Sequence, residues 1–269
     1  MEVRKIRISK NGSNYQIHSP LKNMQTGSEK KPDLSIVILC YRSGKPIKEF
    51  IDKVILLMQK NNISEYELIL VGNYIKNSND ETPKIVAEIA CHNPKIKFSA
   101  VEKKGMMGWD MKTGLAMAAG NYIAVIDGDD QMPAEDLIKV YGKIKEEKLD
   151  LVKTYRIKRG DDPWRKIIST VYNLFFKILF PGLKSQDINS KPKIFSREAY
   201  KKLDLISDDW FIDAEIMILA RRLRLKIGEI PTFFLGLRCR RSFVKPSAIF
   251  EFIKNLIIFR IKEFKHKKK

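Results

Sequence analysis

Three carboxylates follow one short apolar run, and their spacing suits the binding of a hard cation. Asp127, Asp129 and Asp130 lie directly after the apolar stretch 122–126. Carboxylates at positions i and i+2 of a turning loop can converge on one ion, and Gln131 adds a neutral oxygen. Such oxygen ligands suit Mg²⁺ or Mn²⁺, which in turn hold phosphate groups. The same stretch is also typical of a turn followed by a helix N-terminus, where acidic residues are favoured.

The elements around this acidic cluster alternate between predicted strands and predicted helices. Short β-rich apolar runs predict strands at residues 34–40, 66–71, 96–101 and 122–126. Apolar residues recurring every three or four positions predict helices at 48–59, 82–91, 109–119 and 133–147. This alternation predicts an α/β fold, with a mostly parallel central sheet and helices on both faces. Ligands of such sheets bind beyond the carboxyl ends of the strands, where the acidic cluster lies.

Several segments extend the pattern in a fixed order. A glycine-spaced stretch at 104–120 leads into the strand, and the strand ends in Asp-x-Asp-x-Gln-x-Pro at 127–133. Further pieces follow at 187–193, 211–215 and 230–242. Over about residues 34–242 this set resembles the family 2 glycosyltransferases, and among them the transferases that act on polyprenyl and dolichyl phosphates. The resemblance implies a Rossmann-like GT-A fold and inverting transfer of a sugar from a nucleotide-sugar.

The resemblance also implies three groups of site residues. The metal ligands would be Asp127, Asp129 and Gln131, with Asp129 also catalytic. The residues that would bind the nucleotide-sugar donor are Cys40, Tyr41, Asn73, Gly105, Lys112, Asp127 and Gly128. The residues that would bind the phosphate of the acceptor are Arg156, Arg165, Ser169, Lys193 and Arg238.

Three segments depart from the family pattern. Relatives carry Tyr-Asn-Glu after the first strand and Asp-Asp-Gly-Ser after the second, where this chain has Tyr41-Arg42-Ser43 and residues 72–75. Asn73 offers a donor and an acceptor to a base edge, but the carboxylate that contacts the nucleotide in relatives is missing. The identity of the base therefore stays open. In the third departure, Lys193 replaces an arginine and keeps the charge without the planar fork.

The chemistry expected at this site depends on the acceptor. A divalent ion bound by Asp129 would neutralise the charge that grows on the diphosphate as the sugar bond breaks. A lipid phosphate is already ionised near neutral pH, so it needs positioning rather than a base. A hydroxyl of a glycan or other non-lipid acceptor needs a carboxylate base, for which Asp213 is the candidate. The alternative interpretation of Asp213 and Glu215 is a charged first turn of a helix over 214–223.

The net charge of +19 is concentrated at the two ends of the chain. Residues 1–31 hold seven basic and two acidic residues, and residues 236–269 hold eleven basic and two acidic residues. We therefore expect a flexible basic extension over 1–32, a GT-A glycosyltransferase domain over 33–243 and a basic amphipathic helix and tail over 244–269. Such charge points to anionic partners: phosphorylated ligands, an anionic membrane surface or nucleic acid.

Two predicted amphipathic helices, at 163–180 and 248–265, suggest a membrane surface. Basic amphipathic helices with aromatic residues lie in the interfacial plane of anionic bilayers. The alternative is that these helices pack on the sheet or form an oligomer contact, so a homo-oligomer stays open. The sequence has no secretory signal and no apolar run of about 18 residues. We expect a cytoplasmic protein that is peripheral on the inner face of the membrane.

The remaining function classes are weaker. Three separated cysteines and three histidines form no disulfide framework or zinc motif. The sequence has no recognised helix-turn-helix, zinc-finger or RRM signature, which disfavours nucleic acid as a partner. A non-catalytic basic protein that binds nucleic acid or membrane on a GT-A scaffold is the alternative from another class.

Overall fold

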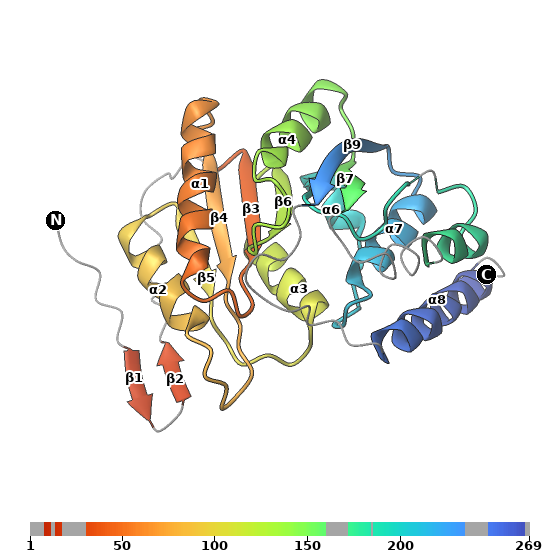
Figure 1. The fold of residues 1–269 in the computed structure, drawn as a ribbon. Helices are drawn as coiled ribbons and strands as arrows, with labels where there is room; N and C mark the ends of the chain where they lie inside the picture. The colour runs from red at the N-terminus through yellow and green to blue at the C-terminus, as the bar shows by residue number, and fades with distance from the viewer. Residues whose placement is uncertain are drawn as a thin grey trace.

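The computed structural model describes residues 8–11, 14–17, 31–159, 172–183, 185–234 and 247–266. Its centre is a seven-stranded sheet (Figure 1). The strands of this sheet are β3 (Leu34–Leu39), β4 (Tyr66–Val71), β5 (Ile96–Ser99), β6 (Tyr122–Asp127), β7 (Leu151–Arg159), β8 (Lys193–Ser196) and β9 (Ile227–Phe234). They lie in the order β5-β4-β3-β6-β8-β7-β9.

The sheet is mostly parallel, as the sequence predicts. β3 pairs in parallel with β4 and β6, β4 with β5, and β7 with β9. Only β8 runs against its neighbours β6 and β7. The chain order reverses on either side of β3, because β4 and β5 lie to one side and β6 to the other. This reversal is a topological switch point, and the loops at the carboxyl ends of β3, β4 and β6 meet there.

Helices cover both faces of the sheet. The described helices are α1 (Pro46–Lys60), α2 (Thr82–His92), α3 (Met107–Met117), α4 (Asp136–Glu146), α6 (Arg197–Lys202), α7 (Ile212–Arg222) and α8 (Ser247–His266), and residues 172–179 are also helical. Successive strand side chains point to opposite faces. Val37 therefore packs in the core under α3 and α7, while Ile36 and Ile38 pack in the core under α1 and α4.

Helix α8 buries one of its faces against α7 and the 172–179 helix. Leu256 is fully buried, and the ring centres of Phe259 and Phe211 lie 5.0 Å apart. Asn255 donates a hydrogen bond of 2.8 Å to Asp209 Oδ2, in the loop before α7. Among the described helices, none is long and apolar enough to span a bilayer.

The N-terminal extension contains a short hairpin. Within the segment expected to be flexible, β1 (Ile8–Asn11) and β2 (Asn14–Ile17) form an antiparallel pair, with Ile8 opposite Ile17. This pair and α8 lie at opposite ends of the molecule (Figure 1). Of the helix predicted over 163–180, the described part is helical at 172–179, and residues 163–171 lie outside the described residues.

Candidate active site

The acidic turn lies at the carboxyl end of β6, beside the ends of β3 and β4. Leu39, the last residue of β3, pairs with Val71 of β4 on one side and with Asp127 of β6 on the other. The Gly128 amide donates a 2.9 Å hydrogen bond to the Leu39 carbonyl. A Cβ at Gly128 would lie 2.6 Å from Ile47 Cδ1, so only glycine lets the turn lie this close to α1.

The turn itself orients the carboxylates. Asp129 Oδ1 accepts a 3.3 Å hydrogen bond from the backbone N–H of Gln131, and Asp130 adopts a left-handed φ of 52°. The Asp127 side chain is 34% exposed. Two carboxylates are thus held at a strand end with access to solvent.

Two buried lysines lie beside Asp127. The Lys191 ammonium is 3.2 Å from Asp127 Oδ2 and 3.1 Å from Asp213 Oδ2. The Lys193 ammonium donates to Asp213 Oδ1 and, at 2.9 Å, to the Ile188 carbonyl. Lys191, Lys193 and Asp213 are each no more than 3% exposed. These residues come from the segment entering β8 and from the first turn of α7, which meet the end of β6.

The electrostatics of this group favour the charged forms of Lys191 and Asp213. Burial alone would lower the pKa of Lys191, but the Asp127 and Asp213 carboxylates raise it above the ordinary lysine value. Burial alone would raise the pKa of Asp213, but Lys191 and Lys193 together lower it. Burial lowers the pKa of Lys193 to about 8, partly offset by Asp213.

This arrangement corrects two sequence expectations. The Asp213 carboxylate is buried, paired with two ammonium groups and shifted to a lower pKa, so in this conformation it lacks the access and the basicity of a general base. Lys193 is fully buried and directed at Asp213, so it does not reach a phosphate at the surface. The cause is that both residues belong to one internal ion-pair cluster, whose members are far apart in the sequence.

The remaining candidates for the acceptor phosphate are engaged or undescribed. Arg156 donates from Nε to Asp187 Oδ2 at 2.5 Å and from Nη2 to Asp187 Oδ1 at 2.9 Å. This bidentate pair occupies the Arg156 guanidinium and neutralises its charge. Arg165, Ser169 and Arg238 lie outside the described residues. Sequence reasoning missed Asp187 as the partner of Arg156, although it had placed Asp187 at the start of a family-like segment.

A pocket of about 480 Å³ opens at the loops that follow β3 and β4. It is lined by Arg42, Gly44, Asn79, Asp80 and Glu81. The loops are tied together, because the Gly44 amide donates to Thr82 Oγ1 at 3.0 Å and Thr82 Oγ1 donates to Asp80 Oδ1. Tyr41 directly precedes Arg42 in the chain, and the Lys103 ammonium lies 4.0 Å from the centre of the Tyr41 ring.

Buried polar atoms without hydrogen-bond partners gather around this pocket. They are Ser43 Oγ, Ser78 Oγ and Asp80 Oδ2. Buried polar groups in folded proteins are nearly always satisfied, by the protein, by water or by a ligand. None of the three was among the expected donor residues, although Ser43 stands where relatives carry Glu. The signal for Ser78 and Asp80 was the run of Asn, Ser and Asp at 77–80 after β4.

The expected donor residues Asn73 and Cys40 lie in the interior instead. Asn73 Nδ2 donates to Asp110 Oδ1 at 3.0 Å, while Asn73 Oδ1 accepts from Ser99 Oγ at 2.8 Å and from the Val101 amide at 3.1 Å. Both Asn73 and Cys40 are 0% exposed. They organise the loops from below rather than facing the pocket, because the side chain at each position points into the core.

Two other expected donor residues hold a loop against α3. Lys112 pairs with Asp208 at 2.7 Å and donates to the Ile206 carbonyl at 3.1 Å. A Cβ at Gly105 would lie 2.8 Å from the Asp208 carbonyl oxygen. Both residues therefore pack against the loop that precedes α7, and neither lines the 480 Å³ pocket.

The acidic turn fits a divalent ion whose coordination is completed by a ligand. Asp127 and Asp129 supply hard oxygen atoms, and the buried Gln131 Nε2 has no hydrogen-bond partner. A flip of the Gln131 side-chain amide exchanges its nitrogen and its oxygen, so that Oε1 would take the position of Nε2. The described residues contain no group of three or more His, Cys, Asp or Glu side chains placed to hold a metal. Phosphate oxygens would then supply the remaining ligands.

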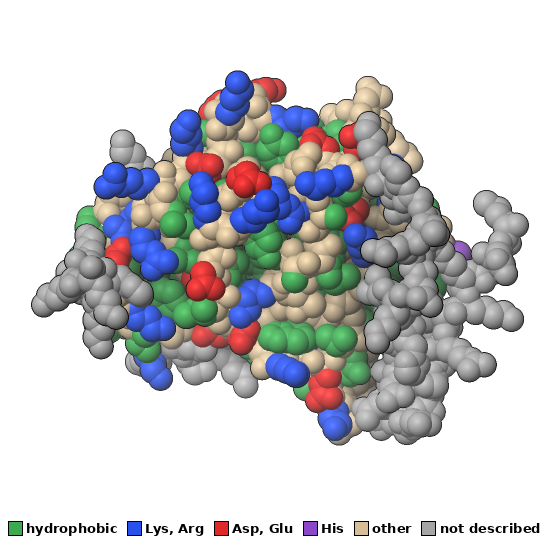
Figure 2. Space-filling view, turned by 180° about the vertical axis from the view of Figure 1, so that it is seen from behind, with side chains coloured by type: hydrophobic (Ala, Val, Ile, Leu, Met, Phe, Trp, Pro, Cys, Tyr) green, Lys and Arg blue, Asp and Glu red, His purple; other side chains and the backbone are tan. Residues whose placement is uncertain are grey.

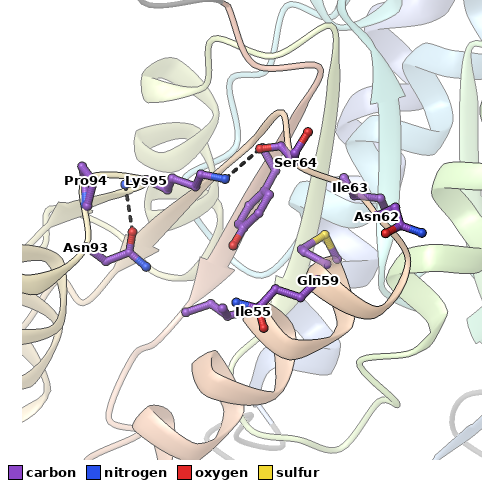
Figure 3. A pocket seen from close by; sticks show the side chains of 10 residues that line it. Ile55, Gln59, Asn62, Ile63, Ser64, Asn93, Pro94 and Lys95 are labelled. Atoms are coloured by element: carbon purple, nitrogen blue, oxygen red, sulfur yellow. Dashed lines mark hydrogen bonds between the residues drawn. The ribbon is translucent and has the colours of Figure 1, made fainter.

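A larger pocket, of about 670 Å³, lies at the opposite end of the strands, where β4 and β5 begin (Figure 3). It is formed by the end of α1 and by the loops that enter β4 and β5. Lys95 donates to the Ser64 carbonyl at 2.8 Å across its rim. It lies at the amino end of β4, away from the acidic turn, and α/β sheets bind ligands at the carboxyl end. We therefore assign the active site to the acidic turn and not to this pocket.

Comparison with known sequences finds sugar transferases. Two dolichyl-phosphate beta-glucosyltransferases, from Trichomonas vaginalis and Dictyostelium discoideum, are each 24% identical to this chain over 216 residues. The dolichol-phosphate mannosyltransferase of Pyrococcus furiosus is 26% identical over 231 residues. These matches cover 74%, 73% and 83% of this chain and 64%, 64% and 62% of the relatives. The chain thus spans just under two thirds of the length of these curated relatives.

Solved structures share the fold. The glucosyl-3-phosphoglycerate synthase of Mycobacterium tuberculosis, in complex with Mn²⁺, uridine diphosphate and glucosyl-3-phosphoglycerate, superposes with a TM-score of 0.63 at 19% identity. The match covers 86% of this chain and 80% of that chain. The same enzyme in complex with uridine diphosphate alone superposes with a TM-score of 0.64. The architecture is therefore GT-A. Because residues 35–204, more than half of the chain, match the model described as "Glycosyl transferase family 2", this chain belongs to that family.

Proposed function

We propose that this protein transfers a sugar from a nucleotide-sugar to a polyprenyl phosphate, with inversion at the anomeric carbon. The observation that carries the proposal is the meeting of two features at the switch point of the sheet. The Asp127 and Asp129 carboxylates lie at the end of β6, and a pocket with unsatisfied polar atoms lies at the ends of β3 and β4. One elongated ligand with a diphosphate and a nucleoside would satisfy both.

In this proposal each loop has a separate task on the donor. Asp127 and Asp129, with Gln131, hold a divalent ion, Mg²⁺ or Mn²⁺. That ion supplies positive charge to the diphosphate that leaves. Ser43, Ser78 and Asp80 line the place of the nucleoside, and Tyr41 closes its edge. Support comes from the functions of the relatives and from the Mn²⁺ and uridine diphosphate in the similar structures.

The state of Asp213 supports a phosphate acceptor over a hydroxyl acceptor. A hydroxyl must lose its proton to a base as it attacks, and the candidate base is buried between Lys191 and Lys193 with a lowered pKa. A lipid phosphate is already an oxyanion and needs no such base. Transfer to the hydroxyl of a glycan stays the alternative outcome of the test below.

The outer face of α8 supports work at a membrane surface. Ile253, Ile257 and Ile261 are 39–49% exposed and lie four residues apart on one stripe. Leu174 and Ile178 of the 172–179 helix are 59% and 66% exposed. Such apolar stripes with nearby lysines insert into the headgroup region of anionic bilayers. We therefore propose that the protein is peripheral at the cytoplasmic face of a membrane.

The distribution of charge gives no support to a nucleic-acid partner. This holds for the described residues on the face seen in Figure 2, where Lys and Arg side chains are spread over the surface with Asp and Glu side chains among them. A protein that follows a nucleic-acid backbone carries a basic stripe along one face or helix.

The proposal is tested in two steps with the full chain. Melting temperatures are measured with a panel of nucleotide-sugars, each with and without Mn²⁺, because a matching donor stabilises the folded state by mass action. The matching donor, carrying a radioactive sugar, is then incubated with vesicles that contain polyprenyl phosphate. Metal-dependent labelling of the lipid supports the proposal. Labelling of a soluble glycan alone favours the hydroxyl alternative, and no labelling of either acceptor refutes transferase function.

A further inference from the structure

The position of Lys191 follows from its contacts at the entry to β8. β8 runs antiparallel to β6, with Lys193 opposite Val125. Lys191 lies two residues before β8, and its ion pair with Asp127 brings it beside the last residue of β6. Both Lys191 and Lys193 pair with Asp213.

Lys191 pairs with the Asp127 carboxylate from the interior of the protein. Its ammonium is 3% exposed and has three contacts: Asp127 Oδ2 at 3.2 Å, Asp213 Oδ2 at 3.1 Å and Met107 Sδ at 3.4 Å. Asp213 is also paired with Lys193. Within the described part of the chain, Lys191 is the basic residue whose ion pair with Asp127 the structure records.

An ammonium at this distance competes with a second cation. A divalent ion bound to Asp127 and Asp129 would lie a few ångströms from the Lys191 charge, in a partly buried place where charges are weakly screened. Lys191 cannot retreat into solvent without leaving Asp213. A bare divalent ion would therefore meet a carboxylate that is already neutralised, with a positive charge beside it.

We propose that Lys191 is a built-in counter-cation of Asp127, which weakens the binding of a free divalent ion and makes tight metal binding depend on an anionic diphosphate. The diphosphate adds the negative charge that offsets Lys191 together with the ion. Metal and donor then bind as a pair, and the empty site does not collect metal. This inference rests on the metal role proposed above for Asp127 and Asp129.

The test measures Mn²⁺ affinity directly, by electron paramagnetic resonance of the free ion, with and without uridine diphosphate. Lys191→Met removes the charge and keeps the length of the side chain. We expect it to bind free Mn²⁺ about tenfold more tightly than the wild type, with a correspondingly smaller gain from uridine diphosphate. Lys191→Arg keeps the charge and is expected to behave as the wild type. Adding Asp127→Asn to Lys191→Met is expected to cancel the gain.

The matched control is Lys201→Met, which removes an exposed lysine of α6 that pairs with Glu198. Its Mn²⁺ affinity is expected to equal that of the wild type. Circular dichroism checks folding, and Lys191→Gln replaces Lys191→Met, with the same criteria, if the latter does not fold. Unchanged or weaker Mn²⁺ binding in the charge-free variant overturns the counter-cation but leaves the metal site. Absence of Mn²⁺ binding in every variant, even with uridine diphosphate, overturns the metal site and this inference together.

Discussion

The two halves of the sheet treat their charged and polar groups in opposite ways. At the ends of β3 and β4, buried polar atoms of Ser43, Ser78 and Asp80 have no hydrogen-bond partner. Around β8 and β7, by contrast, Lys193 pairs with Asp213 and Arg156 with Asp187. We call the first region the incomplete half, because its polar atoms are open to water or a ligand, and the second the complete half, because its buried ion pairs are satisfied within the protein. The distinction concerns the charged groups, since Asn189 Oδ1 in the segment that enters β8 has no hydrogen-bond partner either. Unsatisfied polar atoms at a pocket indicate where a ligand can bind, whereas satisfied ion pairs indicate a framework that holds the site in shape.

Asp127 stands on the boundary between the two halves. It belongs to the acidic turn that we assign to the donor, and it is also the partner of Lys191. Changes on either side of this boundary therefore have different expected effects. Substitutions in the incomplete half should impair binding and spare stability, and substitutions in the complete half should impair stability first.

The largest effect is expected for Asp129→Ala. Loss of a ligand to the divalent ion removes charge stabilisation from the leaving diphosphate, and turnover should fall by about a thousandfold. The exposed turn should keep its fold, so the melting temperature should change little. The measurement is sugar transfer to polyprenyl phosphate. Activity that persists in excess EDTA would contradict the role of the metal.

Asp213→Asn tests the complete half. It leaves Lys191 and Lys193 buried with one carboxylate fewer, and breaking such a buried pair typically costs about 3–5 kcal/mol of unfolding free energy. Urea unfolding followed by circular dichroism measures the loss. The control is Asp204→Asn at an exposed aspartate, which should be neutral. A stable Asp213→Asn variant that has lost only catalysis would restore Asp213 as a general base.

The membrane face of α8 can be tested without disturbing its buried face. In the variant Ile257→Asp with Ile261→Asp, two exposed residues lose their apolar contact with lipid, and partition onto anionic vesicles should fall by at least about tenfold. The control is Leu56→Asp on α1, which is 48% exposed and far along the sheet. Removing all of α8 is less informative, because Leu256 is part of the core. Equal sedimentation of the double variant and the control would exclude α8 as the membrane contact.

Ser78→Ala is the smallest change and the sharpest test of the incomplete half. Its hydroxyl has no partner in the protein, so removing it should leave stability unchanged or slightly raised. Affinity for the matching nucleotide should fall by several-fold, which corresponds to about 1 kcal/mol for one lost hydrogen bond. Calorimetric titration of the nucleotide measures it, with Ser64→Ala at the opposite end of the strands as control. Loss of stability with unchanged nucleotide affinity would show that this hydroxyl serves the fold.

The local sequence was sufficient for strands β3 to β6, for the helices between them and for the position of the acidic turn, but not for β7, β8 or the antiparallel pairing of β8. The apolar runs of β3, β4 and β6 and the periodicity of α1 and α4 are each encoded within a few consecutive residues. Asp127 follows its strand directly, so the end of the strand also placed the carboxylates. The helix bounds differ from expectation by only a few residues: α1, for example, begins at Pro46 rather than at Lys48, because proline is well suited to the first turn.

The partners of the charged residues were decided only when distant segments came together. Lys193 is 20 residues from Asp213, and Lys191 is 64 residues from Asp127. A lysine before a strand has the same local pattern whether it meets a phosphate or a carboxylate. The pairing of β8 against β6 and the docking of α7 beside it turned both lysines inward. Burial then made each charge require a partner, which no local stretch of sequence specifies.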